Sequence, residues 1–415
     1  MPRLQDRSIR QYGTRVRLFG QSHYIDGFEE PEVVWLSPPA GSVGPGPSDD
    51  RMYVVDPVDK AEPYEFPYLP PFAGPAHPPV LPNAQGHFDA IDVDTRDFIA
   101  VHMYGGIRRT LDIWESYFGR RIEWQFHQRF DRLELVPILD WDNAQSGFGF
   151  IETGFGPSQN DEDQLFSLNF DVLAHELGHS IVFAEIGHDE ETVTSEYLGF
   201  QEAMGDIIAL ISALHFESVL DRTLSSSEGN LYALNESSRI GELSNIAQVR
   251  VASNMRKLSD FEAGWSSPHD LAQPLLGALF DSLIDVYQDC LVDRGLIDPE
   301  LRSLSETVPY QMLDDGLVQE RFAEAYHGRH AAFKDALIQA RDHIGDCLVF
   351  LLTRTSPHFL HYAAIGQTWI AADRWLSGGR HAKNFRENLL WRDIGLTTVG
   401  PRLAPADDHE EGHRH

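Results

Sequence analysis

Basic residues, cysteine and long apolar runs are scarce in this chain of 415 residues, and each scarcity excludes a class of protein. Only four lysines occur among the 33 basic residues, and 64 acidic residues bring the formal net charge to -31. A surface this acidic repels nucleic acid and anionic membranes. We therefore expect neither nucleic acid nor a membrane as a partner.

Two cysteines, Cys290 and Cys347, are too few for a disulfide framework and allow one bridge at most. We expect both to be free, buried thiols. No uninterrupted apolar run reaches the ~18 residues of a membrane span, and the first residues lack the apolar core of a secretory signal. The sequence therefore predicts a protein without a transmembrane segment, cytoplasmic or exported without a visible signal peptide.

Proline is abundant between residues 31 and 82, where Tyr64, Phe66, Tyr68 and Phe72 are interleaved with it. Repeated proline disfavours helices and central strands. We expect an extended arm or irregular loop whose aromatic side chains pack onto the body of the protein. A ligand for a proline-recognising partner and a self-inhibiting segment are the alternatives.

The apolar spacing of residues 95–118 predicts a helix that ends at Gly119. Residues 121–130 and 133–141 alternate like strands, and residues 143–156 contain the glycines of a hairpin. Beyond Phe170 the pattern is helical. The expected helices are 171–186, 195–220, 270–290, 317–326, 331–352 and 360–376.

This organisation predicts an α+β fold with four parts. They are a proline-rich arm (1–85), an amino-terminal catalytic lobe (86–190), a helical carboxy-terminal lobe (191–400) and a polar tail (401–415).

The sequence His175-Glu176-Leu177-Gly178-His179 is an HExxH motif within an expected helix. Residues four apart share one helical face, so both imidazoles can reach the same ion. Glu176 lies beside them, where it can take a proton from water on the metal. The motif predicts a zinc site that needs a third ligand.

The next expected helix supplies that ligand in Glu202. Asp206 follows four residues later on the same face, where its carboxylate can accept the second N–H of a ligand histidine. Two carboxylates in an apolar helix need partners. We therefore expect one catalytic zinc ion on His175, His179 and Glu202.

An HExxH helix followed by a helix with EAxxD resembles the thermolysin-like zinc metallopeptidases, the gluzincins related to thermolysin and fungalysin. The likeness extends roughly from residue 95 to residue 290. It implies a two-lobe α+β fold with the active-site cleft between a mixed amino-terminal lobe and an all-helical carboxy-terminal lobe. It also implies a zinc endopeptidase that acts on peptide or protein substrates.

The resemblance also implies roles for residues outside the zinc ligands. His269 matches the second catalytic histidine, which stabilises the oxyanion that develops on the peptide carbonyl. Arg256 matches the arginine that holds the substrate carbonyl, and Asn143-Ala144 match the edge strand that pairs with the substrate backbone. Tyr197 is a further candidate oxyanion donor.

The surroundings of the second catalytic histidine are altered in this chain. No aspartate stands in the register that orients the second histidine, and Glu262, Asp260 or Asp270 is expected to replace it or the ring is held less firmly.

Calcium is a second candidate cofactor, for which the sequence matches the family only in part. Asp171 matches one ligand of the family's calcium site, but Ala213 stands where a glutamate is expected. The acidic run 161–163 suits calcium or a solvated loop.

The leading interpretation is therefore an active endopeptidase. One alternative is a zinc-retaining binding or scaffold protein of the same fold, which would have no use for Glu176. Another is an aminopeptidase of the wider HExxH-plus-Glu group, which needs an acidic anchor for the substrate amine.

Overall fold

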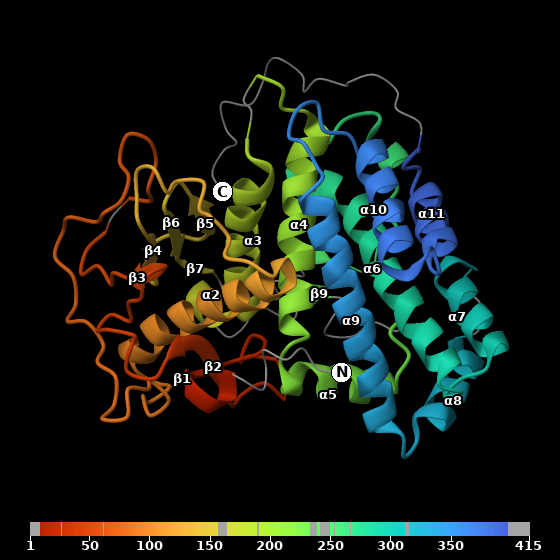
Figure 1. The fold of residues 1–415 in the computed structure, drawn as a ribbon, viewed down its shortest axis with the longest axis horizontal. Helices are drawn as coiled ribbons and strands as arrows, with labels where there is room; N and C mark the ends of the chain where they lie inside the picture. The colour runs from red at the N-terminus through yellow and green to blue at the C-terminus, as the bar shows by residue number, and fades with distance from the viewer. Residues whose placement is uncertain are drawn as a thin grey trace. The chain divides into compact units, whose positions relative to one another are not determined.

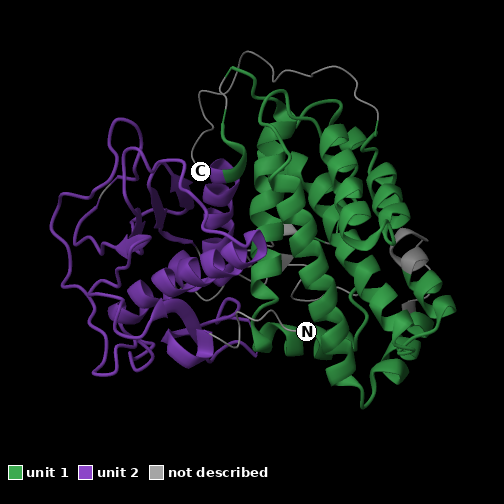
Figure 2. Ribbon diagram, viewed as in Figure 1, with its two compact units in different colours: residues 1, 185–240, 250–406 green, residues 2–184, 241–249, 407–415 purple. Residues whose placement is uncertain are grey.

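The computed structural model describes residues 9–25, 27–60, 62–156, 164–188, 191–232, 239–240, 250–252, 254–265, 267–311 and 315–396. The chain forms two compact units (Figure 2). The amino-terminal unit comprises residues 2–184 with 241–249 and 407–415. The helical unit comprises residue 1, residues 185–240 and residues 250–406.

The amino-terminal unit contains a four-stranded sheet in the order β3-β4-β6-β5 (Figure 1). Its strands are β3 (Met52–Val54), β4 (Leu133–Val136), β5 (Ala144–Gly147) and β6 (Phe150–Thr153). Strands β3, β4 and β6 are parallel, and β5 pairs antiparallel with β6. The predicted hairpin in residues 143–156 is thus confirmed, with β5 at the edge of the sheet.

Further strands form two small antiparallel pairs in this unit. They are β1 (Gly13–Leu18) with β2 (Glu32–Pro39), and β7 (Phe155–Gly156) with β8 (Gln164–Leu165). The 3-10 helix η1 (Phe166–Leu168) follows β8.

The proline-rich segment was expected to be an extended arm or irregular loop without helix or central strand. It contains two strands that were not predicted, β2 and β3, and both lie at the edges of their sheets. Its prolines fall at the end of β2 and outside β3. The packing of aromatic side chains is confirmed for Tyr64, which is buried against Val136 and Phe150. Phe66, by contrast, is 79% exposed.

The expected strand over 121–130 is also wrong. The segment forms turns instead, with Trp124 O accepting from His127 N and Phe126 O from Arg129 N. The rings of Trp124 and Phe126 stack with 5.6 Å between centroids. The side chains therefore alternate in burial without any strand pairing.

Helix α2 (Arg96–Phe118) confirms the helix predicted over 95–118. The Thr95 side chain caps its first turn, and Gly119 ends it at a φ of 64°. Gly106 of α2 allows helix α3 (Phe170–Ile186) to approach, since an added Cβ would lie 2.9 Å from Leu173 Cδ1. α2 therefore supports the helix that carries the HExxH motif.

The helical unit is built around α6 (Pro268–Asp293), which packs against α4 (Ser195–Ala213), α9 (His330–Leu352) and α11 (Ala382–Trp391) (Figure 1). Helix α10 (Tyr362–Ser377) packs against α9 and α11. The remaining elements are α5 (Glu217–Ser227), α7 (Pro299–Gln311), α8 (Asp315–Tyr326), the 3-10 helix η3 (Leu258–Phe261) and the strands β9 (Arg239–Ile240) and β10 (Arg250–Val251).

The expected helix 195–220 is broken, because α4 and α5 meet at a bend of 95°. The Leu214 carbonyl at the end of α4 accepts a hydrogen bond from Arg341 Nη1 at 2.9 Å instead of one from a continuing helix. Helices α7 and α11 were not predicted. Among the described residues, no single helix is long and apolar enough to span a membrane; α4 and α5 pass that test only as a bent pair.

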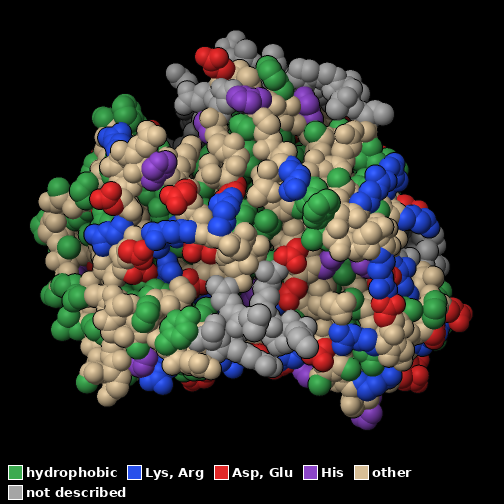
Figure 3. Space-filling view, in the orientation of Figure 1, with side chains coloured by type: hydrophobic (Ala, Val, Ile, Leu, Met, Phe, Trp, Pro, Cys, Tyr) green, Lys and Arg blue, Asp and Glu red, His purple; other side chains and the backbone are tan. Residues whose placement is uncertain are grey.

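Acidic and basic side chains are interspersed over the face of the molecule drawn in Figure 3. Several acidic and basic side chains of the protein form ion pairs, such as Arg96 Nε with Asp56 Oδ2 at 2.6 Å and Arg321 Nη2 with Asp298 Oδ2 at 3.0 Å. The net charge of -31 is thus accompanied by local pairing of opposite charges.

Candidate metal centre

The two histidines of the HExxH motif meet on one face of α3. His175 and His179 are 2% and 6% exposed, and their Nε2 atoms lie 2.9 Å apart. The ring planes are at 89° to each other. Two tetrahedral zinc ligands with bonds of about 2.0 Å would have their nitrogens roughly 3.3 Å apart. The pair therefore has the spacing of two ligands on one ion.

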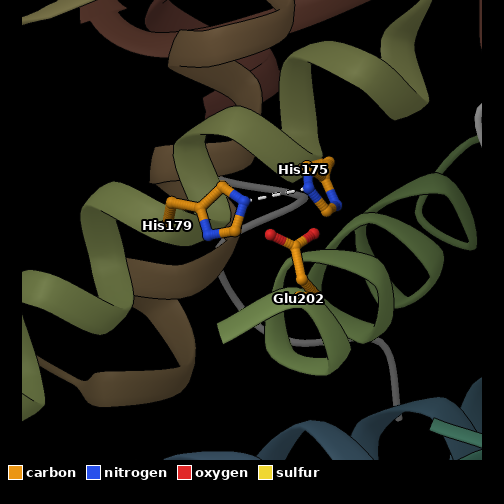
Figure 4. Close-up of side chains that lie close together, drawn as sticks. All are labelled: His175, His179 and Glu202. Carbon is orange, nitrogen blue, oxygen red and sulfur yellow. Dashed lines mark hydrogen bonds between the residues drawn. The ribbon is translucent and has the colours of Figure 1, made fainter. Parts of the chain in front are cut away.

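Glu202 of α4 completes a group with these histidines. One donor atom from each of the three residues lies within 4.8 Å of the others. Figure 4 shows the Glu202 carboxylate facing the two imidazole rings. All three side chains are buried, and so is Glu176, which is 6% exposed. Two imidazoles and one carboxylate are a ligand set found in catalytic zinc sites, and the Glu176 carboxylate lies next to them on α3.

Asp206 lies one turn beyond Glu202 on α4 and is 2% exposed. Carboxylates i and i+4 on a helix share a face. The position of Asp206 on α4 is thus the one that the sequence predicted, while its role toward a ligand histidine stays a prediction.

His269 lies in the first turn of α6, which begins after the Ser267 cap. Its Nδ1 is 2.7 Å from Glu202 Oε2, and its side chain is 34% exposed. The predicted second histidine is thus in contact with the predicted third ligand. An imidazole whose Nδ1 faces a carboxylate still has its other ring nitrogen available to a substrate.

Gly199 makes the close approach of α4 and α6 possible. A Cβ at this position would lie 2.8 Å from Leu271 Cβ and 3.0 Å from its carbonyl carbon. Gly199 precedes Glu202 by one turn, and Leu271 follows His269 by two residues. A side chain at position 199 would therefore push apart the two helices that carry Glu202 and His269.

Tyr197 has its hydroxyl engaged within the helical unit. The hydroxyl donates to the Gly187 carbonyl at 3.1 Å and accepts from Gln201 Nε2 at 2.8 Å. It also lies 3.2 Å from His188 Nδ1. Burial raises the pKa of Tyr197 to about 12. The hydroxyl is therefore a neutral group that holds the connection between α3 and α4.

Asn143 and Ala144 lie at the start of the edge strand β5. Asn143 Oδ1 accepts from the Ala144 N–H at 2.9 Å, and the Asn143 carbonyl accepts from Gly154 N at 2.8 Å. Ser146 of the same strand is hydrogen-bonded to Ser180 of α3, with 2.7 Å between hydroxyl oxygens. The edge strand is thus fixed to the helix that carries His175 and His179.

Arg256 is an exposed residue of the helical unit. Its guanidinium lies over the Phe261 ring and is 3.9 Å from Asp260. Asp260 itself caps η3 by accepting from Lys257 N at 3.0 Å.

Two of the three carboxylates expected to orient His269 are helix caps. Asp270 accepts from the Ser267 N–H at the start of α6, and Asp260 accepts from the Lys257 N–H at the start of η3. The third, Glu262, is exposed.

The calcium prediction is only partly covered by the described residues. Asp171 is buried, and its Oδ1 accepts from Gln21 Nε2 at 3.1 Å. Ala213 is the last residue of α4. The acidic run 161–163 lies outside the described residues.

A second group of metal-binding side chains was not predicted from the sequence. His343, Asp373 and His381 place one donor atom each within 4.8 Å of the others. They belong to α9, α10 and the residue before α11. Because they are spread over three elements, no local spacing signals them.

Comparison with known proteins gives a distant structural likeness. No family model matches the sequence, and no curated protein matches it. Among solved structures, the chain is similar to the precursor of protealysin, a metalloproteinase from Serratia proteamaculans, with a TM-score of 0.38 and 14% sequence identity. The match covers 66% of this chain and 86% of the protealysin chain.

Proposed function

We propose that this chain is a zinc-dependent endopeptidase. The observation that carries the proposal is the buried group of His175, His179 and Glu202, with Glu176 on the same turn of α3. Three protein ligands with a fourth position open are typical of catalytic zinc, whereas structural zinc has four protein ligands. A purely structural site would also have no use for Glu176.

When bound, zinc supplies Lewis acidity that polarises a carbonyl and lowers the pKa of water to about 7. In the proposed reaction, the Glu176 carboxylate accepts a proton from the attacking water and later passes it to the amine nitrogen of the leaving peptide. His269 has its Nδ1 2.7 Å from Glu202 Oε2, and its other ring nitrogen would donate to the developing oxyanion. Asp206 accepts an N–H from a ligand histidine.

Substrate binding follows from the edge strand. Among the residues that the structure describes, β5 pairs with β6 alone, so an extended peptide would pair with its other edge. Asn143 and Ala144 at its start would bind the substrate backbone, and Arg256 would hold a substrate carbonyl. Tyr197 has no part in this mechanism, because its single proton is engaged at Gly187 or His188.

The test compares casein hydrolysis by the wild-type protein, by Glu176→Gln and by Glu185→Gln, which changes another glutamate of α3. Zinc content is measured on each sample. We expect Glu176→Gln to keep its zinc and to lose hydrolysis by roughly 10²–10⁴-fold. Glu185→Gln should match the wild type.

Hydrolysis by Glu176→Gln at the wild-type rate would contradict the proposal. Zinc bound in full without hydrolysis in any sample would favour the binding or scaffold protein. Peptides with free and with blocked amino termini separate the endopeptidase from the aminopeptidase, because only the aminopeptidase requires the free amine.

A further inference from the structure

The second group, His343, Asp373 and His381, lies entirely within the helical unit. His343 Nε2 is 3.1 Å from Asp373 Oδ1, and the centroids of the two imidazole rings are 5.3 Å apart. Asp373 is completely buried, and His381 is 5% exposed. Two imidazoles thus converge on one buried carboxylate, a donor set that suits zinc.

The carboxylate of Asp373 is held in position by hydrogen bonds. The Ser377 hydroxyl donates to its Oδ1 at 2.6 Å, and the His381 backbone N–H donates to its Oδ2 at 2.9 Å. A carboxylate positioned beside two imidazoles is a suitable metal ligand.

His381 has the outer partner that metal-binding histidines usually have. Its Nδ1 is 2.6 Å from Asp289 Oδ2, and the other oxygen of Asp289 is 2.7 Å from Arg302 Nε. With Nδ1–H donated to this carboxylate, the lone pair of the neutral ring is on Nε2. A carboxylate on the far nitrogen fixes the tautomer and orientation of a ligand imidazole.

Cys347 lies beside His343, although its Sγ is not among the donor atoms that all lie within 4.8 Å of one another. It lies one turn after His343 on α9, and its Sγ is 3.7 Å from His343 Nε2. It is a free, buried cysteine. Coordination to a divalent metal deprotonates a thiol, so this cysteine would bind as the thiolate.

We propose that His343, Asp373 and His381 bind a zinc ion, with the Cys347 thiolate as the fourth ligand. Four protein ligands leave no open position, so this site is structural and ties α9 and α10 to the start of α11. It shares no residue with the group on α3 and α4, and the inference does not depend on the proposed peptidase activity.

The first measurement is the number of zinc ions per full-length chain after the metal-free protein is equilibrated with zinc and the excess is removed. We expect two ions in the wild type and one in His343→Ala. His330→Ala is the matched control, because His330 begins the same helix and pairs with a carboxylate, Asp221, at 2.8 Å. It should bind two ions. Equal zinc content in the wild type and His343→Ala would overturn the site.

The second measurement is the absorption spectrum of the cobalt-loaded protein, and its main result comes from the wild type. Cobalt bound to a thiolate gives a sulfur-to-cobalt charge-transfer band, and the group on α3 and α4 contains no sulfur ligand. We expect the band in the wild type and in Cys290→Ala, and its loss in Cys347→Ala. Absence of the band from cobalt-loaded wild type would overturn Cys347 as the fourth ligand.

Discussion

His102 makes the stability of the amino-terminal unit depend on pH in a way that can be calculated. The residue lies in α2 and is completely buried. Its Nδ1–H donates to the Ser167 carbonyl at 2.8 Å, and its Nε2 accepts from the Phe19 N–H at 3.1 Å. Protonation of Nε2 would set two N–H donors against each other in a buried place, so the fold requires the neutral ring.

The size of the effect follows from the pKa. Burial is the main cause that lowers the pKa of His102 from 6.5 to about 4. Between these values the unfolded chain binds a proton that the folded chain does not, so stability falls as the pH drops through this window. A shift of about 2.5 units at about 1.4 kcal/mol each gives a loss of about 3 kcal/mol. The contribution is complete above pH 6.5 and lost near pH 4.

The assay is amide hydrogen exchange of α2 in increasing urea, at several values between pH 7 and pH 4. His102→Gln cannot bind the proton, so between these pH values it should lose about 3 kcal/mol less stability than the wild type. The exposed His127, in the same unit, supplies the control His127→Gln, which should behave as the wild type. Equal losses of stability in the wild type and in His102→Gln would refute the reasoning.

Two further substitutions test the packing around the site and the sheet. Gly199→Ala should destabilise the protein by about 1–3 kcal/mol and slow casein hydrolysis, because the added Cβ separates α4 and α6 and with them Glu202 and His269. An unchanged stability in urea unfolding together with an unchanged hydrolysis rate would show that the close approach does not matter. Lys60→Met leaves the fully buried Glu152 without the ammonium that lies 2.6 Å away and should cost about 3–5 kcal/mol. Adding Glu152→Gln should recover much of this loss of stability in urea unfolding. If Lys60→Met alone is as stable as the wild type, the Lys60–Glu152 pair does not stabilise the fold.

Local signals in the sequence predicted the elements whose limits depend on nearby residues. Helix α2 begins after Thr95 and ends at Gly119, because a capping side chain and a left-handed glycine act on the adjacent turn. The i, i+4 spacing of His175 and His179 predicted their shared face in the same way. A single helix sufficed for that part of the site.

Features that depend on distant pairing were missed. β3 forms in the proline-rich segment because Met52 pairs with Leu133, and its own residues give no sign of this partner. The α4–α5 break similarly involves Arg341, far along the chain. The group around Asp373 forms only where α9, α10 and the start of α11 pack together. Tertiary contacts decide these features, so periodicity and spacing cannot predict them.

The most direct test of the central claim is the rate of casein hydrolysis as zinc is returned to metal-free protein. We predict that the rate rises with added zinc in the wild type and stays at background in Glu202→Gln, which lacks the third ligand's charge. A wild-type rate that stays at background although zinc is bound, or equal recovery in Glu202→Gln, would contradict the claim that His175, His179 and Glu202 hold a catalytic zinc ion.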